Sequence, residues 1–209
     1  MDLFLENIGK KYNENWIFSQ VNQHFSFGNN FVILGQNGSG KSSFLQILSG
    51  FLSPNEGKIV YKNASQFISQ EKIYKYLAVS APSLNLWENF SIKEILQFNF
   101  YFKQSLKSIE EIIDFLEFHD PSLKIEELSS GMQQRLKLAL VLFADLPLLF
   151  FDEPCSHLDA RWIQKYQDLL LTRQKNSTIF IASNHQKPEY EFLENYQAFL
   201  IEKQKFIHF

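Results

Sequence analysis

The chain has 209 residues, of which 45% are hydrophobic and 21% charged, and its formal net charge is −3. This composition is typical of a globular protein, and the charge balance excludes a broad basic surface for nucleic acid. The single cysteine, Cys155, excludes an internal disulfide and favours a reducing compartment. The sequence has no apolar run long enough to span a bilayer, and the acidic, alternating residues 1–6 do not resemble a signal peptide. We therefore expect a cytoplasmic protein that binds no nucleic acid.

Short apolar or alternating stretches along the chain predict strands, and turn residues separate them. The expected strands are residues 2–8, 24–27, 31–34, 58–61, 76–79, 146–151, 178–182 and 198–201.

A glycine-rich loop follows the expected strand 31–34. It reads Gly-Gln-Asn-Gly-Ser-Gly-Lys-Ser-Ser and fits the pattern G-x-x-x-x-G-K-[ST]. Its backbone N–H groups and the N-terminus of an expected helix over residues 43–48 form a nest for phosphate. We predict that Lys41 contacts the outer phosphates of a nucleotide and that the Ser42 hydroxyl binds Mg²⁺. The predicted phosphate-binding residues are Gly35, Gln36, Asn37, Gly38, Ser39, Gly40, Lys41, Ser42 and Ser43.

The pattern changes after Pro82. Ser91 and Ser108 are each followed three residues later by glutamate, a spacing that predicts a capping box and the start of a helix. We therefore expect a helical insertion over residues 83–127. Residues 133–144 are apolar nearly all round, which predicts a buried helix.

Two carboxylates, Asp152 and Glu153, follow the apolar run 146–151. In a parallel sheet the carboxyl ends of the strands form the ligand edge. Asp152 is predicted to hold Mg²⁺, and Glu153 to act as the general base that activates a water. The alternative interpretation is a solvated acidic strand end.

Between the expected insertion and these carboxylates, residues 128–135 read Leu-Ser-Ser-Gly-Met-Gln-Gln-Arg. With the glycine-rich loop before it and Asp-Glu after it, this segment resembles the signature sequence Leu-Ser-Gly-Gly-Gln of ATP-binding cassette (ABC) ATPases. Ser130 replaces a glycine and Met132 the glutamine. The alternative is an ordinary helix cap, since Ser130 and Gln133 also fit a capping box.

The resemblance covers essentially the whole chain and implies an α/β fold in one domain, residues 1–209. That fold has a P-loop NTPase (RecA-like) core, an N-terminal antiparallel β subdomain and the helical insertion. It also implies ATP and Mg²⁺ as cofactors and an ATP-dependent dimer with a second copy or a homologous ATPase. Each ATP would then lie between the Lys41 loop of one copy and Ser129, Ser130 and Gly131 of the other.

Further site residues follow from the same resemblance. Asp159, in Ser-His-Leu-Asp, would lie near the partner subunit, and His185 would contact the γ-phosphate as a catalytic residue beside Glu153 and Lys41. Tyr12 matches the aromatic residue that stacks on adenine, with Trp16 as the alternative. The glutamine that the family places before the insertion is missing, because Pro82 stands there and Gln70 lies too early.

The function that the resemblance implies is the ATP-hydrolysing subunit of an ABC transporter, which drives substrate through a separate membrane permease. The chain would then lie on the inner face of the plasma membrane. It also resembles the compact ATPases of small exporters such as the haem-exporter type. The alternatives are a non-transport ABC ATPase and a silent cassette with an assembly role. The substrate, its direction and the choice of homodimer or heterodimer stay open.

Overall fold

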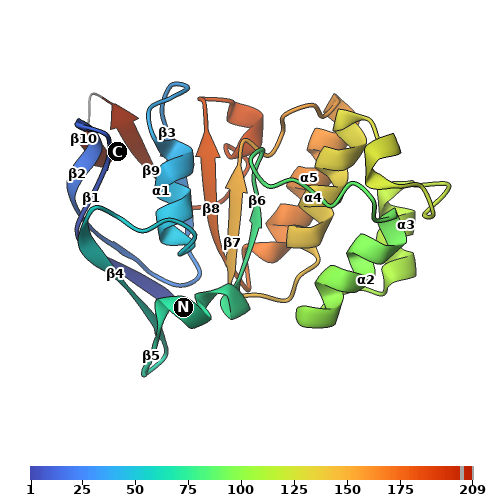
Figure 1. Cartoon of the computed structure of the whole chain (residues 1–209), viewed down its shortest axis with the longest axis horizontal. Coiled ribbons are helices and arrows are strands. Elements are labelled where there is room, and N and C mark those ends of the chain that lie inside the picture. The colour runs from blue at the N-terminus through green and yellow to red at the C-terminus, as the bar shows by residue number, and fades with distance from the viewer. Residues whose placement is uncertain (203–204, 209) are drawn as a thin grey trace.

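The computed structural model describes residues 1–202 and 205–208, which form two β-sheets with helices packed against them (Figure 1). The strands are β1 (Asp2–Tyr12), β2 (Asn15–Phe25), β3 (Asn30–Leu34), β4 (Glu56–Asn63), β5 (Gln66–Ile68), β6 (Leu77–Ser80), β7 (Leu148–Asp152), β8 (Thr178–Ser183), β9 (Tyr196–Glu202) and β10 (Lys205–His208). The α-helices are α1 (Lys41–Leu48), α2 (Ile92–Phe102), α3 (Ile109–Leu116), α4 (Ser130–Leu142) and α5 (Ala160–Arg173). Short 3-10 helices are η1 (Gln70–Tyr76), η2 (Ile125–Glu127) and η3 (Lys187–Glu189).

The larger sheet has the strand order β10-β9-β3-β8-β7-β6 and is parallel except for β10. In its register Leu34 pairs with Ser183, and Asp152 pairs with Ala182. The strands β3, β8 and β7 therefore end side by side, and the loops that follow them meet at one edge. The smaller sheet, β2-β1-β4-β5, is antiparallel. Together these features confirm the predicted α/β P-loop fold with its antiparallel β part.

Alternate residues of the parallel strands supply two separate cores. Phe31 and Ile33 lie in the same cluster as the buried residues of α1, whereas Val32 lies in the cluster that contains the buried residues of α5. Because successive strand residues point to opposite faces, α1 covers one face of the sheet and α4 and α5 cover the other. In Figure 1 the strands β8, β7 and β6 stand between α1 and the group of α4 and α5.

The helices α2 and α3 begin at the two predicted capping boxes. Ser91 N–H donates to Glu94 Oε2 over 2.8 Å, and Glu94 N–H donates back to Ser91 Oγ over 3.2 Å. Ser108 and Glu111 repeat the arrangement at α3. Buried faces of both helices pack on α4 in a third apolar cluster. The three helices lie together at the right of Figure 1.

Three expectations about secondary structure are corrected. The strands expected over residues 2–8 and 24–27 are longer than predicted, because β1 and β2 form a hairpin joined at Asn13 and Glu14. Register shifts along this pair break the alternation from which a strand is recognised. The short strands β5 and β10 were not expected. Finally, α4 begins at Ser130 rather than 133, and polar residues interrupt its apolar run.

Over the described residues, 1–202 and 205–208, no helix combines the length and the apolar character that a membrane crossing requires.

Candidate nucleotide site

The predicted phosphate loop connects β3 to α1. At Gly40 the backbone has φ 107°, and a Cβ atom there would collide with the Ile17 side chain, so only glycine fits. Gly40 is also the N-cap of α1, and no side chain caps this helix. The first N–H groups of α1 consequently remain available to a ligand, and the helix dipole favours an anion there.

Lys41 lies under this loop and not on the surface. Its side chain is 4% exposed, and Nζ donates to the carbonyl oxygen of Gln36 over 3.1 Å. Ser39 Oγ is also buried and has no hydrogen-bond partner among the described residues. An unpaired buried hydroxyl and a buried ammonium group are costly unless a ligand binds them. The loop therefore has the donors and the charge that a phosphate chain would satisfy.

Asp152 ends β7 and lies beside the start of α1. Burial raises the pKa of its carboxyl, and Glu153 adds to the rise, whereas the Ser42 hydroxyl and Lys41 act in the opposite direction. Oδ1 of Asp152 is buried without a hydrogen-bond partner in the described part of the chain. A buried carboxylate oxygen next to a hydroxyl is a suitable pair of ligands for a hard cation such as Mg²⁺.

Glu153 turns away from the strand. Its φ of 47° lies in the left-handed region, which is uncommon for a residue with a side chain, and its N–H donates to the carbonyl of Ala182 over 2.9 Å. This hydrogen bond holds Glu153 next to the end of β8 while its side chain stays half-buried. The strained turn directs a second carboxylate to the same sheet edge as the loop.

His185 follows β8 by two residues and is also left-handed, with φ 57°. It lines a hollow of about 500 Å³ together with loop residues 36–39 and Ile201. The fold thus brings His185 to the phosphate loop, although the two segments are far apart in sequence.

The two aromatic candidates for the base lie differently. The Tyr12 hydroxyl shares a 3.1 Å hydrogen bond with Ser43 Oγ at the start of α1, and the Tyr12 side chain is exposed. The Trp16 ring instead lies over Gly9, where a Cβ atom would come within 2.9 Å of it. Of the two rings, Tyr12 is the one in contact with the loop segment.

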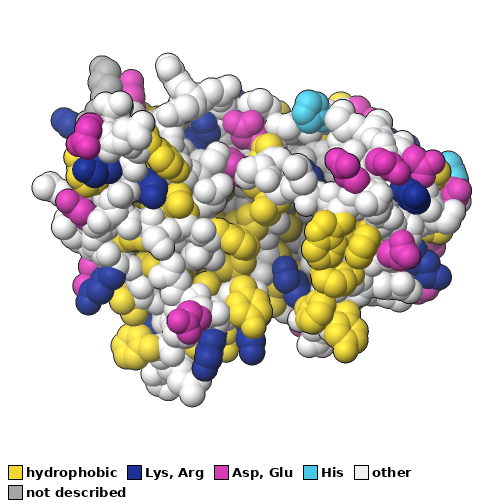
Figure 2. All heavy atoms as spheres, in the orientation of Figure 1, with side chains coloured by type: hydrophobic (Ala, Val, Ile, Leu, Met, Phe, Trp, Pro, Cys, Tyr) yellow, Lys and Arg dark blue, Asp and Glu magenta, His cyan; other side chains and the backbone are white. Residues whose placement is uncertain are grey.

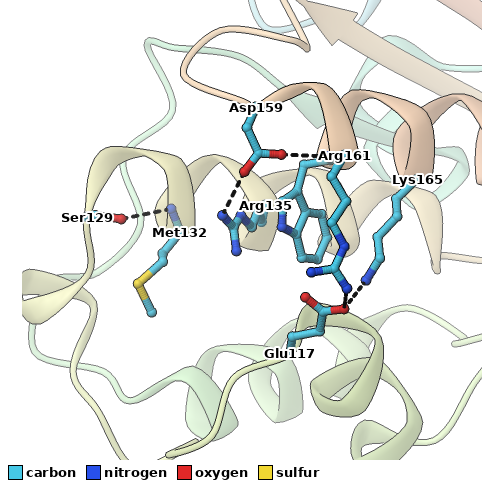
Figure 3. A network of polar contacts seen from close by, with 8 residues as sticks. Glu117, Ser129, Met132, Arg135, Asp159, Arg161 and Lys165 are labelled. Atoms are coloured by element: carbon cyan, nitrogen blue, oxygen red, sulfur yellow. Dashed lines mark hydrogen bonds and ion pairs between the residues drawn. The ribbon is translucent and has the colours of Figure 1, made fainter.

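Ser129, Ser130 and Gly131 start α4, on the opposite face of the sheet from α1. Ser129 Oγ accepts a hydrogen bond from Met132 N–H over 3.3 Å (Figure 3), so the cap is Ser129 and not the Ser130–Gln133 alternative. Ser129 and Ser130 are both exposed. The signature-like residues and the phosphate loop therefore begin two helices that pack on opposite faces of the parallel sheet.

Asp159 is tied to the signature helix. It caps α5 by accepting from Trp162 N–H over 2.9 Å, and its Oδ2 lies 3.8 Å from Arg135 Nη2 of α4 (Figure 3). The Arg135 guanidinium stacks over Trp162 at 4.4 Å from the ring centre. Glu117, the residue directly after α3, pairs with Arg161 and Lys165 of α5. Asp159 and the start of α4 are thus joined into one polar network.

The proline at the usual glutamine position lies in an exposed turn directly after β6. Gln70 begins η1, before β6. Neither position therefore supplies an amide at the end of β6.

Glu189 is a buried residue behind the site that the sequence analysis missed. It is 0% exposed, and its Oε1 accepts from the Cys155 N–H, in the loop after Glu153, over 3.2 Å. Burial raises the pKa of its carboxyl to about 7, against the pull of the Ser183 hydroxyl. No periodicity marks this residue, because its burial depends on α5 and β8 packing around η3.

A parallel sheet, a glycine loop leading into an uncapped helix, and two carboxylates at the adjacent strand end define the class of P-loop ATPases. Residues 18–156 match the ABC transporter family, so this chain belongs to that family. It is an ATP-binding and ATP-hydrolysing subunit of an ABC transporter, as the sequence predicted.

Relatives of similar length support this assignment. The chain is 28% identical over 192 residues to the uncharacterized ABC transporter ATP-binding protein YybJ of Bacillus subtilis, covering 88% of this chain and 85% of that protein. It is 30% identical over 190 residues to the cytochrome c biogenesis ATP-binding export protein CcmA of Reclinomonas americana, with the same two coverages of 88% and 85%. Among solved structures, a dimeric post-hydrolysis state of the ATP-binding cassette MJ0796 with ADP and Pi has a TM-score of 0.81, at 21% identity and with 97% and 95% of the two chains covered. That structure establishes the shared fold.

Proposed function

We propose that Glu153 is the general base of ATP hydrolysis and that Lys41 and His185 bind the γ-phosphate. The observation that carries this proposal is the convergence of the phosphate loop, Asp152, Glu153 and His185 at one sheet edge. Glu153 accepts the proton of the attacking water, while Lys41 stabilises the charge on the phosphoryl oxygens. Such a base contributes roughly 10²–10⁴ in rate.

Ser42 and Asp152 would hold Mg²⁺ in this proposal. The support is the buried, unpartnered Oδ1 of Asp152 beside the Ser42 hydroxyl. When bound, the metal supplies positive charge to the phosphate oxygens. Tyr12 would stack on the adenine, because its hydroxyl lies at the helix start next to the loop.

We propose that the working unit contains two cassettes, with each ATP between the phosphate loop of one and Ser129, Ser130 and Gly131 of the other. The support is that the loop and the signature-like residues begin different helices, on opposite sides of the sheet, and that Ser129 and Ser130 are exposed at the surface. Asp159 would lie at the same junction, since Arg135 links it to α4. Bound ATP then stabilises the dimer interface, and hydrolysis weakens it.

The remaining partner in the proposal is a membrane permease, which would hold the chain at the cytoplasmic face of the membrane. The support is a cluster of aromatic side chains on and before α2, of which Phe90 is half-buried and the others are exposed. We call it the aromatic cluster: Trp87, Phe90, Phe98, Tyr101 and Phe102. Figure 2 shows hydrophobic side chains gathered over the region of α2. A hollow of about 540 Å³ opens beside Trp87 and Phe98. Large exposed apolar patches of this kind mark interaction sites.

The test uses Glu153→Gln. This variant keeps the shape of the side chain but cannot accept a proton, so we expect it to bind ATP and to accumulate as an ATP-dependent dimer with little phosphate release. Size-exclusion chromatography with light scattering measures the dimer, and a phosphate-release assay measures turnover. Glu194→Gln, at an exposed position away from the site, is the matched control. Turnover by Glu153→Gln equal to that of the control would remove the assigned role.

A further inference from the structure

A second, smaller pocket lies between β6, α2 and α4, and none of the loop residues 35–43 lines it. Its volume is about 140 Å³, and its walls include Ser80 of β6, Asn99 and Lys103 from the α2 side, and Lys137 of α4. Asn85 and Leu86 line both this pocket and the hollow of the aromatic cluster. The two depressions are therefore neighbours, and one bound segment can reach both.

The pocket has positive charge without a counter-charge. None of its lining residues in the described part of the chain is acidic, and neither lysine has an ion pair there. Burial lowers the pKa of Lys103 and also that of Lys137, and no acidic neighbour offsets the shift in either case. Two desolvated ammonium groups that line one small pocket favour an anion between them.

A third polar group in the pocket is also unsatisfied. Ser80 is 2% exposed, and its Oγ is buried with no hydrogen-bond partner among the residues described. A buried hydroxyl without a partner costs roughly 1–3 kcal/mol. Asn99 uses one amide hydrogen on the carbonyl of Leu140, over 3.4 Å. A hydroxyl and two ammonium groups together provide donors for the two oxygens of a carboxylate.

We propose that this pocket binds the carboxylate of an acidic side chain on the permease, whose neighbouring apolar side chains pack on the aromatic cluster. The inference rests on the proposed function, because the occupant is the proposed permease. Charge complementarity selects an acidic segment, and the shared wall at Asn85 and Leu86 selects one with apolar residues beside the acid. Glu88 lines the aromatic hollow, and its negative charge repels the acidic side chain of the permease toward the pocket with the two lysines.

A zero-length carbodiimide cross-linker tests the contact, because it joins an amine to a carboxylate only when the two touch. The tagged full-length chain is expressed in its source organism, and isolated membranes are treated with the reagent and analysed by mass spectrometry. We expect an amide link from Lys103 or Lys137 to an Asp or Glu of an integral membrane protein. We also expect Lys103→Met with Lys137→Met to lower the membrane-bound fraction at least about tenfold. Lys58→Met with Lys62→Met, on β4, is the matched control.

The outcomes separate the two proposals. If the chain sediments with membranes but cross-links to a membrane protein only through other lysines, the carboxylate pocket is wrong and the permease partner stands. If the Lys103/Lys137 double variant binds membranes as well as the control variant does, the carboxylate pocket is likewise wrong and the permease partner stands. If the unmodified chain is absent from the membranes, the permease proposal itself fails.

Discussion

The N-termini of α1 and α2 show two opposite uses of the same backbone groups. At α2, Ser91 and Glu94 satisfy each other's backbone N–H groups, so this helix end needs nothing from outside. At α1 the N-cap is Gly40, no side chain intervenes, and the N–H groups stay open. The end without a cap is the one that faces buried polar atoms without partners, Ser39 Oγ and Asp152 Oδ1. Between these two helices, the capped end stabilises the fold and the uncapped end has free N–H groups for an anion.

The largest expected effect on nucleotide binding and turnover comes from removing the charge of Lys41 at the open end of α1. Lys41→Ala should reduce ATP affinity by more than about a hundredfold, equivalent to about 2.8 kcal/mol, and abolish phosphate release. The reason is that the phosphates then lose the attraction of the buried Lys41 ammonium group and contact only the backbone N–H groups of the loop. Equilibrium binding of a fluorescent ATP analogue measures the change. Lys58→Ala, at an exposed ion pair with Glu6, is the control and should bind like the parent chain.

Glu189 is a second buried polar group near the site, and the fold gives its carboxylate no positively charged partner among the described residues. Its pKa in the folded protein is about 7, above the ordinary value of 4.5. Between these values the folded chain keeps a proton that the unfolded chain has lost, so the free energy of unfolding falls as pH rises. The loss is complete above pH about 8 and amounts to about 3 kcal/mol.

Glu189→Gln should therefore stabilise the protein at pH 8 by up to about 3 kcal/mol, and much less at pH 5, where the native carboxyl is protonated. The glutamine oxygen can still accept from the Cys155 N–H. Urea unfolding at the two pH values measures the difference, with Glu194→Gln as the exposed control. An equal effect at both pH values would contradict the buried-acid account.

Breaking the capped end should have a smaller and purely structural effect. Ser91→Ala removes the acceptor for Glu94 N–H and should cost about 1 kcal/mol of stability. ATP affinity should not change, because α2 does not contribute to the nucleotide edge. Thermal unfolding and nucleotide binding are measured on the same samples. Weaker ATP binding in Ser91→Ala would mean that the two helix ends are coupled.

The smallest effect is expected at Pro82, after β6. Pro82→Gln returns an amide side chain to the position where the family has glutamine, and should lower the half-saturating Mg²⁺ concentration for hydrolysis about twofold, or about 0.4 kcal/mol. A Mg²⁺ titration of ATPase activity at fixed ATP measures it, with Pro82→Ala as the control. Identical titrations for the two variants would show that this position does not influence the metal.

Contiguous motifs made most of the nucleotide edge predictable. The loop 35–43 and the pair Asp152–Glu153 each follow an apolar strand, and parallel strands place such residues at a common edge. The caps of α2 and α3 were equally local and were predicted correctly. The hairpin β1–β2 was only partly predicted, because register shifts disturb its alternation. Glu189 was missed, since nothing within a few residues of it reports its burial.

The sequence by itself predicted a phosphate-binding loop and the family to which the chain belongs, because those signals are short-range: spacing, glycines and strand ends. Only the tertiary structure decided that the helices after the loop and after the signature residues cover opposite faces of the sheet. It also decided that Arg135 of α4 pairs with Asp159, and that Lys103 and Lys137 line one pocket with Ser80. These relations arise from the packing of segments distant along the chain. The free energy of such contacts depends on burial, which no local pattern specifies.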